Sequence, residues 1–275
     1  MQADADRRAE RRPAVVIDGV SHHFRAPDGR VMNALDNVSL DLFEHEFFAI
    51  VGPSGCGKST LLNMVSGLLT QAAGSIELRG DGRALTQRDI GYITQDSNLY
   101  PWCTVVENVL VPLQIRKVDK VEARERAQHW IKLVGLAGFE KHYPKQLSGG
   151  MQKRCSIART MVYEPDLLLM DEPFGALDAI TRQMLHSTIL ELWQQRQTSV
   201  MFITHDLTEA ISLADRVAVM SSRPGQIRAV VDIDLVRPRD VQNVTSAPHF
   251  RLMREQLWHL LEPELGAHQG MSAHE

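Results

Sequence analysis

The sequence predicts an α/β fold with three parts: a core on a parallel sheet, a small antiparallel sheet before it, and an inserted helical subdomain. Short, wholly apolar runs, as at 47–51 and 167–170, are typical of buried parallel strands. The first run leads through a glycine-rich turn into a helical pattern, which is the order of a strand–loop–helix unit. From residue 96 to 165 helical periodicity dominates, so we place the helical subdomain there.

The composition fits one large folded domain or two small ones. The chain has 275 residues, 44% of them hydrophobic and 23% charged, which is enough apolar material for a core. Its net charge of −4 does not favour nucleic acid as a partner. Its three scattered cysteines favour a reducing compartment over disulfides. We expect neither a signal peptide nor a membrane span, since no uncharged apolar run approaches ~18 residues.

The N-terminal part has the pattern of an antiparallel sheet. Residues 1–13 are expected to be a disordered basic tail. Residues 14–18, 20–24 and 37–43 each predict a short strand, and we expect these strands to pack against the glycine-rich turn. Phe24 allows two interpretations, a core side chain or a ring that stacks on a bound base.

The glycine-rich turn has the residues of a phosphate-binding loop. Its glycines let backbone N–H groups approach an anion, and the following helix directs its positive dipole end there. Lys58 supplies a full charge for the β- and γ-phosphates, and the Ser59 hydroxyl is placed to bind Mg²⁺. The predicted nucleotide-binding residues of the loop are Gly52, Pro53, Ser54, Gly55, Cys56, Gly57, Lys58, Ser59 and Thr60.

Polar side chains follow three other predicted strands. They are Gln95, the pair Asp171 and Glu172, and His205, and ligands bind at the carboxyl ends of parallel strands. Two adjacent carboxylates at a buried strand end are costly unless a cation or a reaction needs them. We therefore expect Asp171 to hold Mg²⁺ and Glu172 to accept a proton from an attacking water.

Two features stand out in the helical subdomain. Ser148 is placed to cap a helix whose first N–H groups are left bare by Gly149 and Gly150, which makes a second anion site. Met151 begins the apolar stripe of that helix. The cluster at 100–102, Tyr-Pro-Trp, is either local packing or a contact surface.

Taken in order, these motifs closely resemble those of the ATP-binding subunit of an ABC transporter. The resemblance covers residues 15–233 and implies a P-loop NTPase core with an N-terminal antiparallel β subdomain and an inserted helical subdomain. It implies that Gln95 belongs to the glutamine loop, which touches Mg²⁺ and signals to the membrane partner. It makes 147–151 the signature motif and Asp171 with Glu172 the Walker B pair.

The resemblance also implies roles for three single residues. Asp178 lies in the loop that crosses to the opposite subunit, His205 is the switch histidine near the γ-phosphate, and Phe24 is the adenine-stacking aromatic. Met151 stands where the family's signature motif usually has glutamine, so the resemblance does not extend to a side-chain contact to ribose at this position. Ser148 and the two glycine amides after it still provide phosphate donors.

The implied organisation is a tail over 1–13, an ATP-binding domain over 14–240 with its helical subdomain at about 96–165, and a C-terminal extension over 241–275 with one amphipathic helix. The implied cofactors are ATP and Mg²⁺. Each ATP would lie between the phosphate loop of one copy and the signature motif of a second copy.

The implied partners are a second copy of the chain and separate transmembrane permease subunits at the cytoplasmic face of the membrane, with an extracytoplasmic solute-binding protein acting indirectly. Residues 101–109 and 222–225 are similar to the nitrate, sulfonate and taurine import subfamily, which implies uptake of a small anionic solute. The alternatives are a non-transport ABC ATPase, an importer for another class of solute, and a regulatory nucleotide-binding module.

Overall fold

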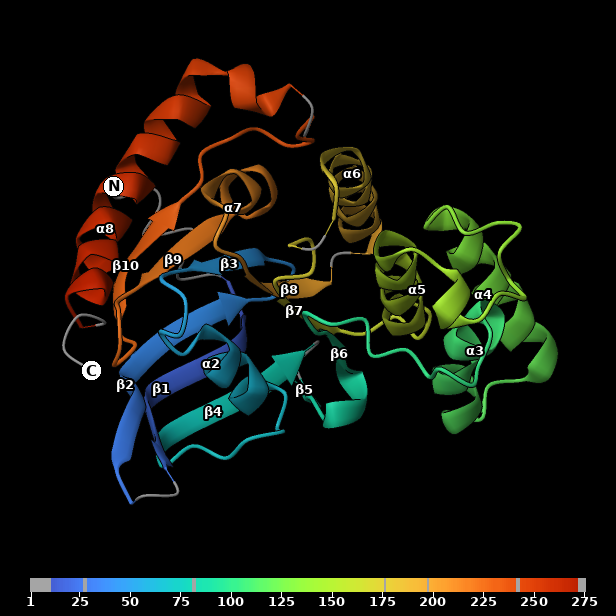
Figure 1. Ribbon diagram of the computed structural model, residues 1–275, viewed down its shortest axis with the longest axis horizontal. Helices are drawn as coiled ribbons and strands as arrows, with labels where there is room; N and C mark the ends of the chain where they lie inside the picture. The colour runs from blue at the N-terminus through green and yellow to red at the C-terminus, as the bar shows by residue number, and fades with distance from the viewer. Residues whose placement is uncertain are drawn as a thin grey trace.

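The structure is a computed structural model that describes residues 11–26, 29–80, 83–175, 177–196, 198–240 and 243–271, with backbone only at 266–271. The described part leaves out most of the expected N-terminal tail, the last four residues, and Ala176, which the resemblance assigns to the loop that crosses to the opposite subunit. Two sheets lie face to face, and a helical layer extends from one edge of the larger sheet (Figure 1).

The larger sheet forms the core that the apolar runs predict. Its order is β10-β9-β3-β8-β7-β6, and all neighbouring pairs are parallel except β9 with β10. Every residue of β3, β8 and β9 is buried, which explains why these strands are apolar except at the first residues of β8 and β9, Ser199 and Arg216. The strands are β3 (Phe47–Val51), β6 (Ile90–Ile93), β7 (Leu167–Asp171), β8 (Ser199–Ile203), β9 (Arg216–Met220) and β10 (Ile227–Asp232).

The smaller sheet is antiparallel, in the order β2-β1-β4-β5. The two short strands expected at 14–18 and 20–24 are one strand, β1, whose pairing with β2 shifts register between Ile17 and Val20. Gly19 has a positive φ of 58° at this irregularity, so the alternation breaks there and the sequence reads as two strands. The strands are β1 (Pro13–Arg25), β2 (Val31–Phe43), β4 (Ala73–Gly80) and β5 (Arg83–Ala84).

The helices divide between the core and the helical layer. Figure 1 shows α3, α4 and α5 as a layer of their own at the right, whereas α2, α6, α7 and α8 surround the larger sheet. Side chains of Thr104, Asp119 and Ser148 cap the three helices of the layer. The helices are α2 (Lys58–Val65), α3 (Val105–Ile115), α4 (Lys120–Leu133), α5 (Gly149–Met161), α6 (Ala179–Arg196), α7 (Leu207–Leu213) and α8 (Pro248–Met271).

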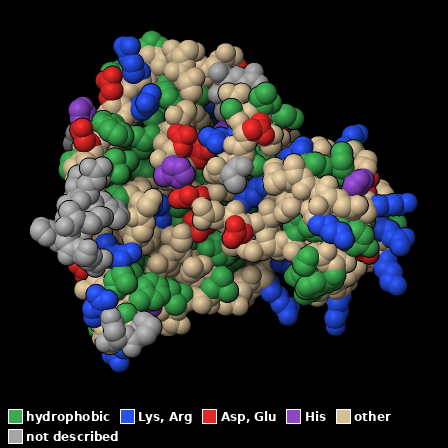
Figure 2. All heavy atoms as spheres, in the orientation of Figure 1, with side chains coloured by type: hydrophobic (Ala, Val, Ile, Leu, Met, Phe, Trp, Pro, Cys, Tyr) green, Lys and Arg blue, Asp and Glu red, His purple; other side chains and the backbone are tan. Residues whose placement is uncertain are grey.

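The outer edge of the helical layer is basic. Figure 2 shows Lys and Arg side chains gathered there, with acidic and histidine side chains in the middle of the same face. Exposed basic residues of α3, α4 and the turn between them include Arg116, Lys117, Lys120, Arg124 and Lys132. Among the residues that the structure describes, no helix has the length and apolar character to cross a bilayer.

The larger sheet separates two apolar cores. One core lies between the two sheets and includes Leu61 and Leu62 of α2, while the other includes Trp130 of α4 and reaches α8. On α8, Leu257 is fully buried but its neighbour Trp258 is 45% exposed. Trp258 therefore lies on the more exposed face of this helix.

Candidate functional site

The glycine-rich turn connects β3 to α2 in a conformation that only glycine adopts without strain. Gly57 has a φ of 103°, and a Cβ there would lie 2.7 Å from Cδ2 of Leu35 and 2.8 Å from the carbonyl oxygen of Ala34. Lys58 follows as the first residue of α2 and is 5% exposed. Its Nζ donates hydrogen bonds to the carbonyls of Gly52 (2.9 Å) and Pro53 (2.8 Å), so a buried ammonium lies across the loop.

A pocket of about 360 Å³ opens at this loop. It combines loop residues with parts of β1 and β2 and with residues that follow β6, β7 and β9, so the lining comes from six places in the sequence. Phe24 is 43% exposed, which rules out its interpretation as a core side chain. The lining residues are Phe24, Met32, Ala34, Ser54, Gly55, Gly57, Lys58, Ser59, Thr60, Gln95, Glu172 and Arg223.

The expected Mg²⁺ ligands lie beside the loop. Ser59 Oγ donates a hydrogen bond of 3.0 Å to Oδ1 of Asp171. Burial raises the pKa of Asp171, and the carboxylate of Glu172 raises it further, while the bond from Ser59 and the charge of Lys58 lower it. A partly buried carboxylate of this kind is stabilised by a cation.

The donor chemistry fits Mg²⁺. A hydroxyl, a carboxylate and the amide of Gln95 supply the hard oxygen ligands that Mg²⁺ takes together with phosphate oxygens. Within the described ranges, no group of three or more His, Cys, Asp or Glu side chains forms a metal cage. The arrangement therefore suits a metal bound with a nucleotide.

The ends of β7 and β8 bring Glu172 and His205 together. Oε2 of Glu172 lies 3.2 Å from Nδ1 of His205. The backbone N–H of Glu172 donates to the carbonyl of Ile203 (3.0 Å), and Glu172 has a positive φ of 42°. A non-glycine residue in this region of φ is strained, and here the strained backbone carries the carboxylate that the sequence singles out as a proton acceptor.

The signature residues and Asp178 lie outside this pocket. Ser148 caps α5, with its Oγ accepting the N–H of Met151 (3.3 Å), and Ser148 and Gly149 are exposed. Met151 packs against the apolar core, which leaves Ser148 and the glycine amides as the exposed polar groups. Asp178 is exposed at the start of α6 and accepts the N–H of Thr181 (3.0 Å). Among the described residues that line the pocket, none belongs to the signature segment.

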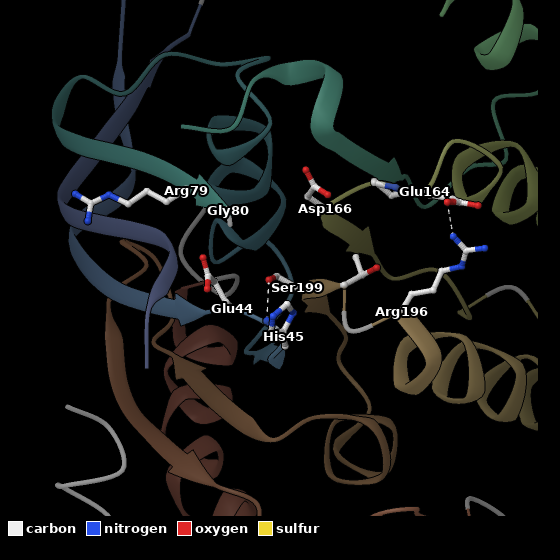
Figure 3. Close-up of a pocket in the computed structure, with 10 residues that line it drawn as sticks. Glu44, His45, Arg79, Gly80, Glu164, Asp166, Arg196 and Ser199 are labelled. Atoms are coloured by element: carbon white, nitrogen blue, oxygen red, sulfur yellow. Dashed lines mark hydrogen bonds and ion pairs between the residues drawn. The ribbon is translucent and has the colours of Figure 1, made fainter. Parts of the chain in front are cut away.

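A second hollow, of about 250 Å³, lies at the opposite end of the strands (Figure 3). Its lining includes Ser199, the first residue of β8, and Asp166, which precedes β7. Glu164 in this hollow is ion-paired with Arg196, as Figure 3 shows, and Asp166 is ion-paired with Arg83. These ion pairs engage Glu164, Arg196 and Asp166, and the hollow lies at the end of the strands away from the phosphate loop, so we assign it no role in nucleotide binding.

Two basic residues at the site are missing from the sequence-based predictions. Arg223 donates from Nη2 to the carbonyl of Gly55 (3.0 Å). Lys153 of α5 is 4% exposed and donates to the carbonyls of Thr94 and Gln95, the latter at 2.9 Å. Burial lowers the pKa of Lys153 to about 8. No local pattern reports these contacts, because each joins residues at least 58 positions apart.

Comparison with known proteins identifies the family. The sequence model described as ABC transporter matches residues 35–175. The chain belongs to the ABC transporter family. It is 44% identical over 238 residues to an uncharacterized ABC transporter ATP-binding protein of Methanocaldococcus jannaschii, covering 86% of this chain and 88% of that protein. It is 43% identical over 225 residues to an aliphatic sulfonates import ATP-binding protein of Bacillus cereus, covering 82% and 88%.

Solved structures agree with this family. Two dimeric structures of the ATP-binding cassette MJ0796 match 81% of this chain and 100% of theirs at 31% identity, with TM-scores of 0.72 and 0.73. One of them is a post-hydrolysis state with ADP and Pi bound. The chain is therefore an ABC ATPase subunit that uses ATP and Mg²⁺, and the α/β fold expected from its sequence is confirmed.

Proposed function

We propose that this chain is the ATP-hydrolysing subunit of an importer that takes up a small anionic solute of the nitrate, sulfonate or taurine kind through a separate permease. The observation that carries the mechanism is that one pocket gathers Lys58, Ser59, Gln95 and Glu172, while Ser148 and Gly149 of the signature motif lie exposed outside it. The sulfonate import protein among the relatives supports the class of solute.

In this proposal the loop amides and Lys58 hold the β- and γ-phosphates, and the ring of Phe24 stacks on the base. Ser59, Asp171 and Gln95 would hold Mg²⁺. The bound metal would neutralise charge on the phosphate oxygens.

Glu172 accepts a proton from the attacking water. The water oxygen then bonds to the γ-phosphorus as the bond to the β–γ bridging oxygen breaks, which gives ADP and inorganic phosphate. His205, 3.2 Å from Glu172, braces the γ-phosphate.

A second copy completes the site. Because Ser148, Gly149 and Gly150 do not line the pocket of their own chain, their hydroxyl and amide donors are placed to bind the γ-phosphate held by another copy. Asp178, exposed at the start of α6, would lie at the same contact. Two such copies form a clamp with two composite sites, which closes on ATP and opens after hydrolysis.

The aromatic cluster after Gln95 is the proposed socket for the permease. Trp102 is 73% exposed and Tyr100 is 36% exposed, and their ring centroids lie 5.8 Å apart. The buried side chain of Asn108 fixes this loop by accepting the N–H of Tyr100 (2.8 Å) and donating to the carbonyl of Cys103 (3.0 Å). A rigid loop that presents exposed aromatic rings is typical of a protein contact. In this proposal the permease is that partner, and the chain works at the cytoplasmic face of the membrane.

An uptake measurement tests the proposal. A strain that lacks this chain is complemented with the wild type or with Lys58→Ala, and uptake of labelled taurine, an alkanesulfonate and nitrate is followed, with leucine as the control solute. We expect uptake of at least one oxyanion to be lost in the deletion strain, restored by the wild type and not restored by Lys58→Ala. Unchanged uptake of all three oxyanions would rule out this class of solute.

A further inference from the structure

One charged residue of the nucleotide pocket belongs to none of the motifs that bind nucleotide. Arg223 lies in the turn between β9 and β10, and its side chain lines the pocket. Its Nε and Nη2 donate to the carbonyl of Gly55 at 3.3 and 3.0 Å, and its Nη1 lies against Sδ of Met32. Met32 pairs with Phe24 across β1 and β2, so their side chains share one face of the sheet. The guanidinium therefore lies between the phosphate loop and the proposed base-stacking ring.

The turn that carries Arg223 is packed directly against the phosphate loop. The N–H of Gly225 donates to the carbonyl of Ala34 (2.9 Å), and the carbonyl of Gly225 accepts the N–H of Asp36 (3.0 Å). A Cβ on Gly225 would lie 2.1 Å from the carbonyl oxygen of Cys56. The turn is thus hydrogen-bonded to β2 and leaves no room for a side chain between Gly225 and the phosphate loop.

The same turn is tied to the C-terminal helix. Oε2 of Glu264, in α8, accepts the backbone N–H (2.8 Å) and the hydroxyl (3.2 Å) of Ser222, the residue before Arg223. Its Oε1 accepts Nε of Arg228 at 2.9 Å. The side chain of Glu264 is 12% exposed and both of its oxygens are used, so this carboxylate fixes the start of the turn. Figure 1 shows α8 running along the side of the sheet formed by β10.

We propose that Arg223 binds the nucleotide at its α-phosphate and that Glu264 is a positioning residue that ties this contact to α8. A nucleotide with its base on Phe24 and its terminal phosphates on the loop has its ribose and α-phosphate in between, where Arg223 lies. A guanidinium has five N–H donors, of which Gly55 takes two, and it binds phosphate oxygens well. This inference rests on the proposed function, because it requires that the nucleotide binds in this pocket.

Titration of the purified full chain with a fluorescent ADP analogue, with competition by ADP, tests the inference. We expect Arg223→Gln to weaken ADP binding by about tenfold or more, since a hydrogen bond to a charged group is lost. Arg223→Lys, which keeps the charge without the planar fork, should fall between. Glu264→Gln should weaken binding severalfold. The matched control is Arg126→Gln on α4, which breaks an exposed ion pair of 2.7 Å with Glu122 and should bind ADP like the wild type.

The salt dependence of ADP binding distinguishes a contact of Arg223 with phosphate from hydrogen bonds to Gly55 that only hold the loop in place. If Arg223 meets a phosphate, wild-type affinity falls more steeply between low and high potassium chloride than the affinity of Arg223→Gln. If Arg223 only holds Gly55 in place, Arg223→Gln lowers ADP affinity by the same factor at low and at high potassium chloride, and the inference is wrong. Unchanged ADP affinity in Arg223→Gln and Arg223→Lys would overturn it as well. Lys58→Ala distinguishes the two failures: if it also binds ADP like the wild type, the pocket is wrong and the proposed function fails as well.

Discussion

Replacing Glu172 with glutamine tests the proton acceptor at the end of β7. The substitution keeps the size of the side chain, and the N–H of Glu172 still donates to the carbonyl of Ile203, so the strand end stays in place. It removes the negative charge that lies 3.2 Å from His205, and an amide does not accept the proton of the attacking water. We therefore expect ATP to bind as well as before or better, while hydrolysis is lost.

The size of the loss follows from the position of the carboxylate. A positioned general base contributes about 10²–10⁴-fold to a rate, which is about 2.7–5.4 kcal/mol at the barrier. The side chain of Glu172 is only 22% exposed, so bulk water is a poor substitute for it. We expect a loss of about 10³–10⁴-fold in turnover for this reason.

Release of inorganic phosphate at saturating Mg-ATP measures the turnover of Glu172→Gln, and light scattering after gel filtration measures whether ATP holds it as a dimer. The matched control is Glu122→Gln on α4, which breaks an exposed ion pair of 2.7 Å with Arg126 and should leave turnover unchanged. If Glu172→Gln keeps more than about a tenth of wild-type turnover, Glu172 is not the general base.

Three further predictions follow from the same geometry. Gly225→Ala forces a Cβ toward the Cys56 carbonyl. We expect it to lower the free energy of unfolding by about 1–3 kcal/mol in urea titrations and to weaken ATP binding. An unchanged midpoint of urea unfolding would contradict the packing of this turn. Cys56 is 1% exposed and burial raises its thiol pKa. A thiol reagent should therefore label the half-buried Cys103 before Cys56, as measured by peptide mapping. Equal labelling of the two cysteines would refute this order of reactivity. Inactive Lys58→Ala and Ser148→Arg chains, mixed equally, should recover about a quarter of wild-type ATPase, because half the dimers carry one intact composite site; no recovery counts against shared sites.

The parallel core and the phosphate loop could be predicted from the sequence because local patterns encode them. A strand such as Phe47–Val51, buried on both faces, needs apolar residues throughout, and the turn after it needs glycine at a φ of 103°. The Ser148 cap and the 2.7 Å ion pair of Glu122 with Arg126 are likewise set by residues three or four positions apart.

Helix α6 shows why other parts escaped prediction. It buries His186 along with Leu185 and Ile189, whereas Ile180 and Met184 are 74% and 60% exposed. Apolar residues therefore surround this helix, and no apolar face is visible in its sequence. Ile180, one of these exposed apolar residues, follows Asp178 by two positions at the start of α6.

The contacts that assemble the candidate site could not be predicted from local patterns, because they join residues far apart in the chain. Arg223 reaches Gly55 across 168 positions, and Lys153 reaches the carbonyl of Gln95 across 58. Each places a cation on backbone carbonyls, which any residue offers, so no side-chain pattern marks the acceptor. Lys153 joins α5 to the segment that follows β6, and Arg223 joins the phosphate loop to the turn that Glu264 of α8 holds. Under the proposed function, a push by the permease on Trp102 would reach Ser148 through α5, and α8 would act on nucleotide affinity through Arg223.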